Sequence, residues 1–176
     1  DTDRDFYDAA AGYKYDHGTL LGFSLTHLGG TGIPDLGDFL FMPGTGEIHL
    51  DPGTHDDPDS GYRSRYSHEE EWCSPNYYAV NLLDYGVKAE MTSSLHSGIL
   101  RFTYPEAEDS FILLDLDHTL WWNCAWSNIR IEDEHTLTGY KLVKGWGPER
   151  HIYFTAEFSK PIEDFGIMQD GGLVHY

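Results

Sequence analysis

Short stretches in which apolar and polar residues alternate recur along most of the chain. Residues 77–83 and 87–92 alternate on either side of the turn Asp84-Tyr85-Gly86. A period of two is typical of strands with one buried face, so the pattern predicts a hairpin here. It predicts another over 12–15 and 20–26 across Asp16-His17-Gly18. Further strands are expected at 39–42 (ending at Pro43-Gly44), 47–50, 100–104, 111–114 (covered on both faces), 129–131, 137–143 and 152–158.

No segment keeps a helical period beyond two turns. Many short strands separated by turns every eight to twelve residues or so favour an all-β fold, a two-sheet antiparallel β-sandwich. A closed barrel fits the same pattern less well. The 176 residues suit one domain, so we predict a single β-sandwich domain over 1–176.

The chain is strongly acidic, with 30 Asp and Glu against 11 Lys and Arg and a formal net charge of -19. This charge disfavours nucleic acid and anionic membrane surfaces as partners. No apolar run approaches the roughly 18 residues of a spanning helix. The acidic balance, together with Tyr, Trp and His, favours neutral or cationic small ligands, and sugars are the neutral ligands that aromatic faces bind well. Because the chain begins Asp1-Thr2-Asp3, without Met or a signal peptide, we expect a processed product or part of a longer protein.

The stretch from Gly22 to Gly32 reads Gly-Phe-Ser-Leu-Thr-His-Leu-Gly-Gly-Thr-Gly. It begins as a strand and then loses bulky groups, which permits close approach to the main chain. His27 and Thr31 are its candidate polar contacts. One interpretation is a ligand held near the backbone. The other is a β-bulge or tight crossover with a hydrogen-bonded histidine.

Three polar clusters leave alternatives open. The acidic loop 51–60 does not match an EF-hand, because Tyr66 stands where the bidentate glutamate should be, so we expect a solvated loop. Asp115-Leu116-Asp117-His118 is either a metal site or an ordinary acidic strand end. His68, beside three glutamates, is either a hydrogen-bonding centre or part of an exposed acidic rim.

Aromatic and cysteine positions are also ambiguous. Trp121, Trp122 and Trp126 could form a sugar-stacking platform or be buried on strands. Cys73 and Cys124 are either buried thiols or one disulfide, which would close a loop of about fifty residues and contribute ~4 kcal/mol. They have no metal-site spacing.

Four ordered blocks resemble glycoside hydrolase family 92. The 22–32 stretch with Asp35, Gly37-Asp38 and Met42-Pro43 is similar to the family's GFSHTHLSGTG…GD…MP signature. The resemblance continues over nearly the whole chain in three further blocks: 66–69 with 74–78; 84–92 with Gly98 and 101–105; and 139–140, 145–146, 153–154 with 157–161.

The resemblance implies an N-terminal β-sandwich of a calcium-dependent, inverting exo-α-mannosidase that acts on α-mannosides of N-glycans or mannans. Its partners would be a mannose-containing glycan and a larger (α/α)6 domain of the same protein. That domain would supply the general acid, the general base and most calcium ligands, so no catalytic or metal residue is assigned here. Substrate-binding residues would be Tyr7, Asp8, His27 and Thr31. A secreted or periplasmic location is expected.

The chain departs from the family pattern at several positions. Tyr7 occupies a position where the family usually has tryptophan, and Ala10 one where cysteine is common. Leu25 replaces the first histidine of the signature, and His96 and Leu100 replace residues that are frequently Arg and His, respectively. A second function therefore stays open, a non-catalytic carbohydrate-binding or interaction module on the same fold.

Overall fold

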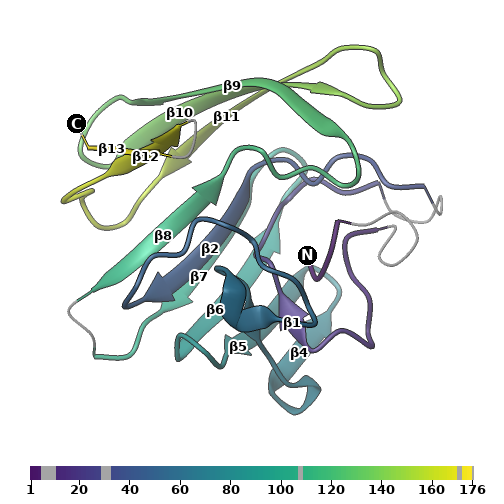
Figure 1. Ribbon diagram of the computed structural model, residues 1–176, viewed down its shortest axis with the longest axis vertical. Coiled ribbons are helices and arrows are strands. Elements are labelled where there is room, and N and C mark those ends of the chain that lie inside the picture. Colours follow the sequence, from purple (N-terminus) through teal and green to yellow (C-terminus); the bar gives the residue numbers. More distant parts are fainter. Residues whose placement is uncertain (5–10, 29–32, 107–108, 170–171, 176) are drawn as a thin grey trace. The chain divides into compact units, whose positions relative to one another are not determined.

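A computed structural model describes residues 1–4, 11–28, 33–106, 109–169 and 172–175. They form two compact units, Asp1–Trp121 and Trp122–Tyr176, which we describe separately (Figure 1). The described residues form strands in antiparallel pairs and two short 3-10 turns, η1 (Pro58–Ser60) and η2 (His68–Glu70), without an α-helix. The all-β antiparallel class is therefore confirmed, while the single domain over 1–176 stays a prediction. None of these described elements is a helix long and apolar enough to cross a membrane.

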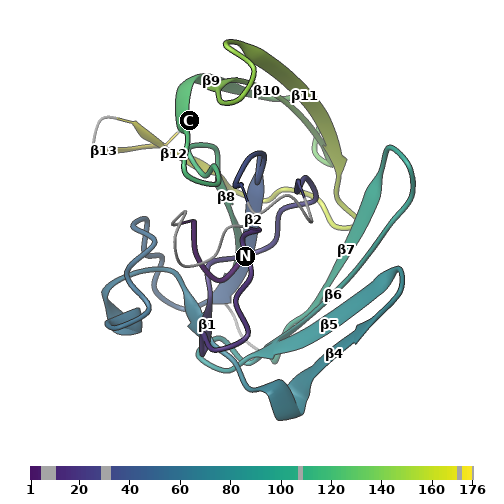
Figure 2. The same cartoon turned by 90° about the vertical axis from the view of Figure 1, so that its right-hand side faces the viewer.

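The first unit contains a four-stranded sheet, curved in Figure 2, with the order β4-β5-β6-β7. Its strands are β4 (Glu71–Ser74), β5 (Tyr77–Leu82), β6 (Val87–Ser93) and β7 (Gly98–Thr103). The hairpin predicted over 77–92 is confirmed, because β5 and β6 pair from Leu82–Val87 to Tyr78–Met91. Gly86 supports its turn with a φ of 63°.

Strand β2 (Leu40–Thr45) pairs with β8 (Ser110–Asp115). The prediction that Pro43 ends this strand is wrong. Phe41 exchanges backbone hydrogen bonds with Phe23, on the side away from β8. Pro43, two residues later, faces the same side, so its missing N–H removes no bond between β2 and β8.

Two other strand predictions are wrong and one is partly wrong. Residues 12–15 and 47–50 form no strand, and within 20–26 only β1 (Thr19–Leu20) is a named strand. It pairs with β3 (Ser64–Arg65), so its partner is distant and not the neighbouring segment. Strand β8 is not covered on both faces, since Ile112 is 38% exposed. Local alternation identifies a strand but not its partner.

The core of the first unit joins its three sheets, β1-β3, β2-β8 and β4-β5-β6-β7. Side chains of β1, β2, β5 and β6 meet there with three tyrosines. Its buried members are Leu20, Leu21, Phe23, Leu40, Met42, Tyr62, Tyr66, Val80, Leu82, Tyr85, Val87 and Ala89. Buried tyrosine requires a partner for its hydroxyl. Tyr85 donates to the carbonyl of Tyr62 over 2.9 Å, and Tyr62 donates to Asp115 Oδ2 over 2.6 Å.

The second unit contains the antiparallel sheet β11-β10-β9 and a separate hairpin. Strands β9 (Asn123–Ile131), β10 (Thr136–Lys144) and β11 (Arg150–Glu157) confirm the three strands predicted over 129–158. The hairpin of β12 (Gly166–Gln169) and β13 (Gly172–His175) was not predicted from the sequence. Cys124 is half-buried on β9 and Cys73 is exposed on β4, and no disulfide joins these two thiols. Cys73 is therefore not the buried thiol that the sequence favoured.

Candidate functional site

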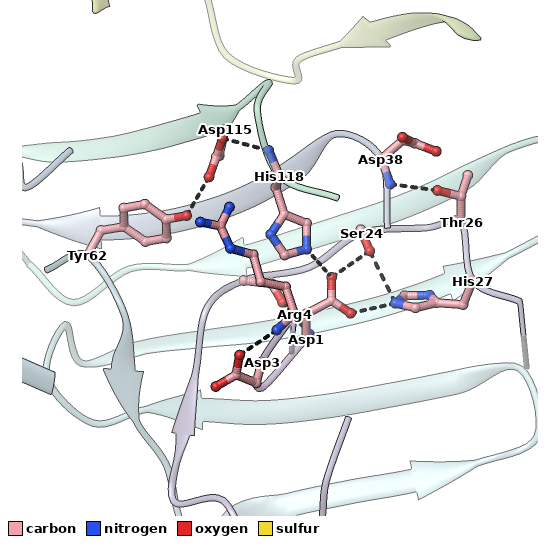
Figure 3. Close-up of polar contacts among 11 residues, drawn as sticks. Asp1, Asp3, Arg4, Ser24, Thr26, His27, Asp38, Tyr62, Asp115 and His118 are labelled. Atoms are coloured by element: carbon pink, nitrogen blue, oxygen red, sulfur yellow. Dashed lines mark hydrogen bonds and ion pairs between the residues drawn. The ribbon is translucent and has the colours of Figure 1, made fainter. Parts of the chain in front are cut away.

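One buried carboxylate joins three separate segments of the first unit (Figure 3). Asp1 Oδ2 accepts a hydrogen bond from Ser24 Oγ over 2.7 Å and lies 3.1 Å from Nε2 of His118. Asp1 Oδ1 lies 2.5 Å from Nε2 of His27. The Asp1 side chain is 1% exposed. We call Asp1, Ser24, His27 and His118 the Asp1 cluster.

Backbone contacts hold Asp1 in this position. Its nitrogen donates to the carbonyl of Gly22 over 2.6 Å, and its carbonyl accepts from Leu21 N over 2.8 Å. Gly12 has a φ of 82°, and a Cβ atom at this glycine would lie 2.5 Å from Asp1 Oδ1. The site therefore requires glycine at position 12, for its backbone conformation and for the space that the carboxylate occupies.

Asp115 positions His118 and does not serve as a free ligand. Its Oδ1 accepts from the backbone nitrogens of Asp117 and His118 over 2.8 and 2.9 Å. Its Oδ2 accepts from Tyr62, a buried phenol whose pKa is raised by burial, so that Tyr62 remains a donor. Within the described part of the chain, no three His, Cys, Asp or Glu residues could hold a metal ion. The metal interpretation of residues 115–118 finds no support there.

His27 is the one predicted site residue that the structure describes. Its side chain is 32% exposed, and its backbone forms an isolated bridge with Leu36. The pKa of His27 is lowered to about 4, chiefly by burial and then by the Asp1 amino group, while the Asp38 carboxylate acts in the opposite direction. The neutral ring donates from Nε2 to the Asp1 carboxylate, which can only accept. Its Nδ1 then carries a lone pair and has no hydrogen-bond partner among the described residues.

Thr26, next to His27, forms hydrogen bonds to the other end of the loop, at Gly37 and Asp38. Its Oγ1 accepts from Asp38 N over 2.9 Å, and its carbonyl accepts from Gly37 N over 2.6 Å. Gly37 has a φ of 74°, and a Cβ atom there would lie 2.7 Å from Leu120 Cγ. The Gly37-Asp38 pair of the signature thus serves to close the loop.

The remaining predicted contacts, Tyr7, Asp8 and Thr31, lie outside the described residues, so their role stays a prediction. The hydrogen-bonded histidine of the structural interpretation is present in His27. Sequence reasoning missed Asp1 and Ser24, and it placed His118 in a different cluster. Ser24 lies within the signature itself, whereas no local pattern connects Asp1 with His118.

A second polar centre surrounds His68. Its Nδ1 lies 2.5 Å from Glu71 Oε2, its Nε2 lies 2.6 Å from the carbonyl of Tyr15, and its ring stacks on the Tyr15 ring at 3.9 Å. Glu71 also accepts from Tyr78 and Tyr13 over 2.7 and 3.1 Å. The hydrogen bond to Glu71 is the main cause that raises the pKa of His68. The hydrogen-bonding interpretation is confirmed, and the centre attaches residues 13–15 to β4.

Comparison with known proteins identifies the family to which this chain is similar. A family model described as the glycosyl hydrolase family 92 N-terminal domain matches residues 1–175. None of the curated proteins compared with the chain matches it.

Two solved structures are similar over nearly the whole chain. One is the family GH92 alpha-mannosidase BT3965 from Bacteroides thetaiotaomicron, and the other is the same enzyme in complex with mannoimidazole. Each superposes with a TM-score of 0.96 at 69% sequence identity, over 99% of this chain. The chain spans 23% of the length of that mannosidase. By its family model and by this similarity, the chain belongs to glycosyl hydrolase family 92, as an N-terminal domain.

Proposed function

We propose that this chain is the N-terminal sandwich of an inverting, calcium-dependent exo-α-mannosidase that acts on α-mannosides of N-glycans or mannans. The observation that carries the proposal is the 69% identity, over 99% of the chain, to a mannosidase whose complex with mannoimidazole has been solved. The role of the chain is to line the sugar pocket with Tyr7, Asp8, His27 and Thr31. A secreted or periplasmic location belongs to the same proposal.

His27 is the contact for which geometry offers support. Its Nε2 is held by Asp1, and this fixes the plane of the ring. The side chain is 32% exposed, and its Nδ1 can accept one hydrogen bond from a sugar hydroxyl, because the ring is neutral near neutral pH. In the sequence, Gly29, Gly30 and Gly32 follow His27 closely, and residues without a side chain would let a sugar approach the backbone.

Proton transfer is assigned outside this chain. Inverting hydrolysis uses one carboxylic acid and one carboxylate about 6.5–9.5 Å apart. The Asp1 carboxylate is 1% exposed and faces Ser24, His27 and His118, so it is unsuited to protonate a glycosidic oxygen. We therefore place the general acid and the general base in the further part of the protein, the expected (α/α)6 domain.

Calcium is likewise assigned to that further domain. Among the described residues, no three His, Cys, Asp or Glu side chains are grouped so that they could hold a metal ion, which is consistent with this assignment. We derive no step of the reaction from the ion.

The test is an assay of the full-length protein on an aryl α-mannoside and on α-1,2-mannobiose, with and without a calcium chelator. We expect hydrolysis of at least one substrate, loss of activity with the chelator and recovery on addition of Ca²⁺. Release of the β-anomer first, read by NMR, would establish inversion. If no mannoside is hydrolysed, with or without calcium, the result would favour the alternative that the chain is a carbohydrate-binding or interaction module. Cell fractionation tests the location.

A further inference from the structure

One face of the sheet β9–β11 exposes aromatic side chains. Trp126 on β9 is 55% exposed and Tyr153 on β11 is 72% exposed. The opposite face of the same strands carries most of their apolar residues, which are buried or half-buried: Ile129, Ile131, Leu137, Val143, Ile152 and Phe154. Scattered surface aromatics need no explanation, but grouped ones mark binding sites.

Strand register brings the three rings together. Tyr140 on β10 pairs directly with Tyr153, and Trp126 pairs with Leu142, two residues from Tyr140 on the same face. The ring centroids of Trp126 and Tyr140 are 5.1 Å apart, and those of Tyr140 and Tyr153 are 4.8 Å apart. The three side chains therefore form a continuous aromatic strip across the sheet, in the part labelled β9, β10 and β11 in Figure 1.

Polar groups alternate with this strip. Tyr140 Oη lies 2.7 Å from Nδ1 of His151, which can accept a hydrogen bond from the phenol, and Nε2 of the same ring lies 3.9 Å from Glu149 Oε2. Asn128 pairs with Tyr140 from the other side and is exposed. Flat rings edged by an amide and an imidazole suit a pyranose, which has an apolar C–H face and a rim of hydroxyls. An apolar protein surface would offer no hydrogen-bond partner to the Asn128 amide.

We propose that the strip of Trp126, Tyr140 and Tyr153, with Asn128 and His151 at its edges, binds pyranose rings of an α-mannan. The pyranose class follows from the face itself, and the choice of mannose rests on the proposed function. Stacking on Trp126 and Tyr153 supplies the affinity, while Asn128 and His151 bind hydroxyls at the rim.

Binding of α-mannan by the full-length protein is measured as retardation in native gels that contain the polysaccharide. Trp126→Ala and Tyr153→Ala should each weaken binding roughly tenfold, the factor that corresponds to about 1.4 kcal/mol. Trp72→Ala is the matched control, because Trp72 is 65% exposed on β4 in the other unit, and it should bind as wild type does. Unchanged binding by both strip variants overturns the proposal.

Hydroxyl-radical footprinting of the wild-type protein tests the same proposal without any substitution. Trp126 and Tyr153 should be oxidised in the free protein and protected by α-mannan. Rings that stay unreactive without mannan are covered by another part of the protein, and this also overturns the proposal. If the strip binds mannan but no mannoside is hydrolysed, only the proposed function fails. If mannosides are hydrolysed and both strip variants bind as wild type does, only this inference fails.

Discussion

Oδ2 of Asp1 lies 3.1 Å from Nε2 of His118, and each of the two side chains is 1% exposed. The residues are 117 positions apart, and Ser24 donates to the same oxygen. Burying a carboxylate is costly unless hydrogen bonds satisfy it. The Asp1 cluster provides those bonds, so the position of His27 depends on residues far from it in the sequence.

Asp1→Asn should lower the free energy of unfolding by about 2–3 kcal/mol, because a buried amide in place of the carboxylate leaves at least one donor unsatisfied. Urea denaturation of the full-length protein measures this change. Asp117→Asn is the matched control, since Asp117 is exposed and its carboxylate forms no hydrogen bond or ion pair among the described residues. A similar loss in both variants would contradict the importance of the Asp1 cluster.

His27→Gln and His27→Ala separate the structural role of His27 from its proposed sugar contact. Glutamine can place a donor near the position of Nε2 and keep the bond to Asp1, but it lacks the Nδ1 acceptor. We expect the free energy of unfolding of His27→Gln to lie within about 1 kcal/mol of the wild-type value. Its kcat/KM on an aryl α-mannoside should nevertheless fall at least tenfold, and that of His27→Ala at least as far.

The two losses are compared in the same preparations, by urea denaturation and by initial rates. Wild-type activity in His27→Gln would show that His27 serves only the hydrogen bond to Asp1. Parallel loss of activity and stability in His27→Ala would point to the same structural role.

Gly12→Ala should destabilise the protein more than Gly46→Ala. Both glycines have a positive φ, 82° and 78°, so each substitution costs about 1–2 kcal/mol in backbone strain. Only at Gly12 does the added Cβ meet another atom, Asp1 Oδ1 at 2.5 Å, whereas nothing lies within 4 Å of a Cβ at Gly46. We expect a further loss of about 1–3 kcal/mol at Gly12. Equal urea midpoints would refute the tight fit.

Glu90 should contribute to the loss of stability in acid. Hydrogen bonds from Arg101 and then Tyr77 lower the pKa of Glu90 to about 2 from its ordinary 4.5. Because its folded pKa is depressed, its contribution is present above pH 4.5 and is lost as pH falls through about 2. The stability difference between wild type and Glu90→Gln should therefore shrink over that window. A difference independent of pH would disprove this ionic role.

The contribution of His68 to stability should depend on pH in the opposite direction to that of Glu90. The pKa of His68 is raised, chiefly by the hydrogen bond to Glu71, so its contribution is present below the ordinary histidine pKa of 6.5 and is lost as pH rises through the folded value. NMR titration of the His68 ring should give a pKa above 6.5. Glu71→Gln should lower that pKa. The same titration midpoint in both proteins would count against the pairing.

Local pattern determined much of this molecule. Alternation over 77–92 and 129–158 predicted the strands that form, because a strand with one buried face repeats every two residues wherever its partner lies. Motif order alone identified the family, and the glycine-rich signature pointed to His27. Net charge and aromatic content directed attention to neutral ligands before any geometry was known.

Only the tertiary structure decided which segments meet. Thr19–Leu20 pairs with Ser64–Arg65, Pro43 lies inside a strand, and Trp126 contacts Tyr140 and not its neighbours in sequence. The Asp1 carboxylate brings Ser24, His27 and His118 together through contacts that span up to 117 positions. The period of apolar side chains indicates which residues are buried. Backbone hydrogen-bonding groups are the same at nearly every residue, so they do not specify which two strands pair. Partner choice therefore depends on packing of the whole chain.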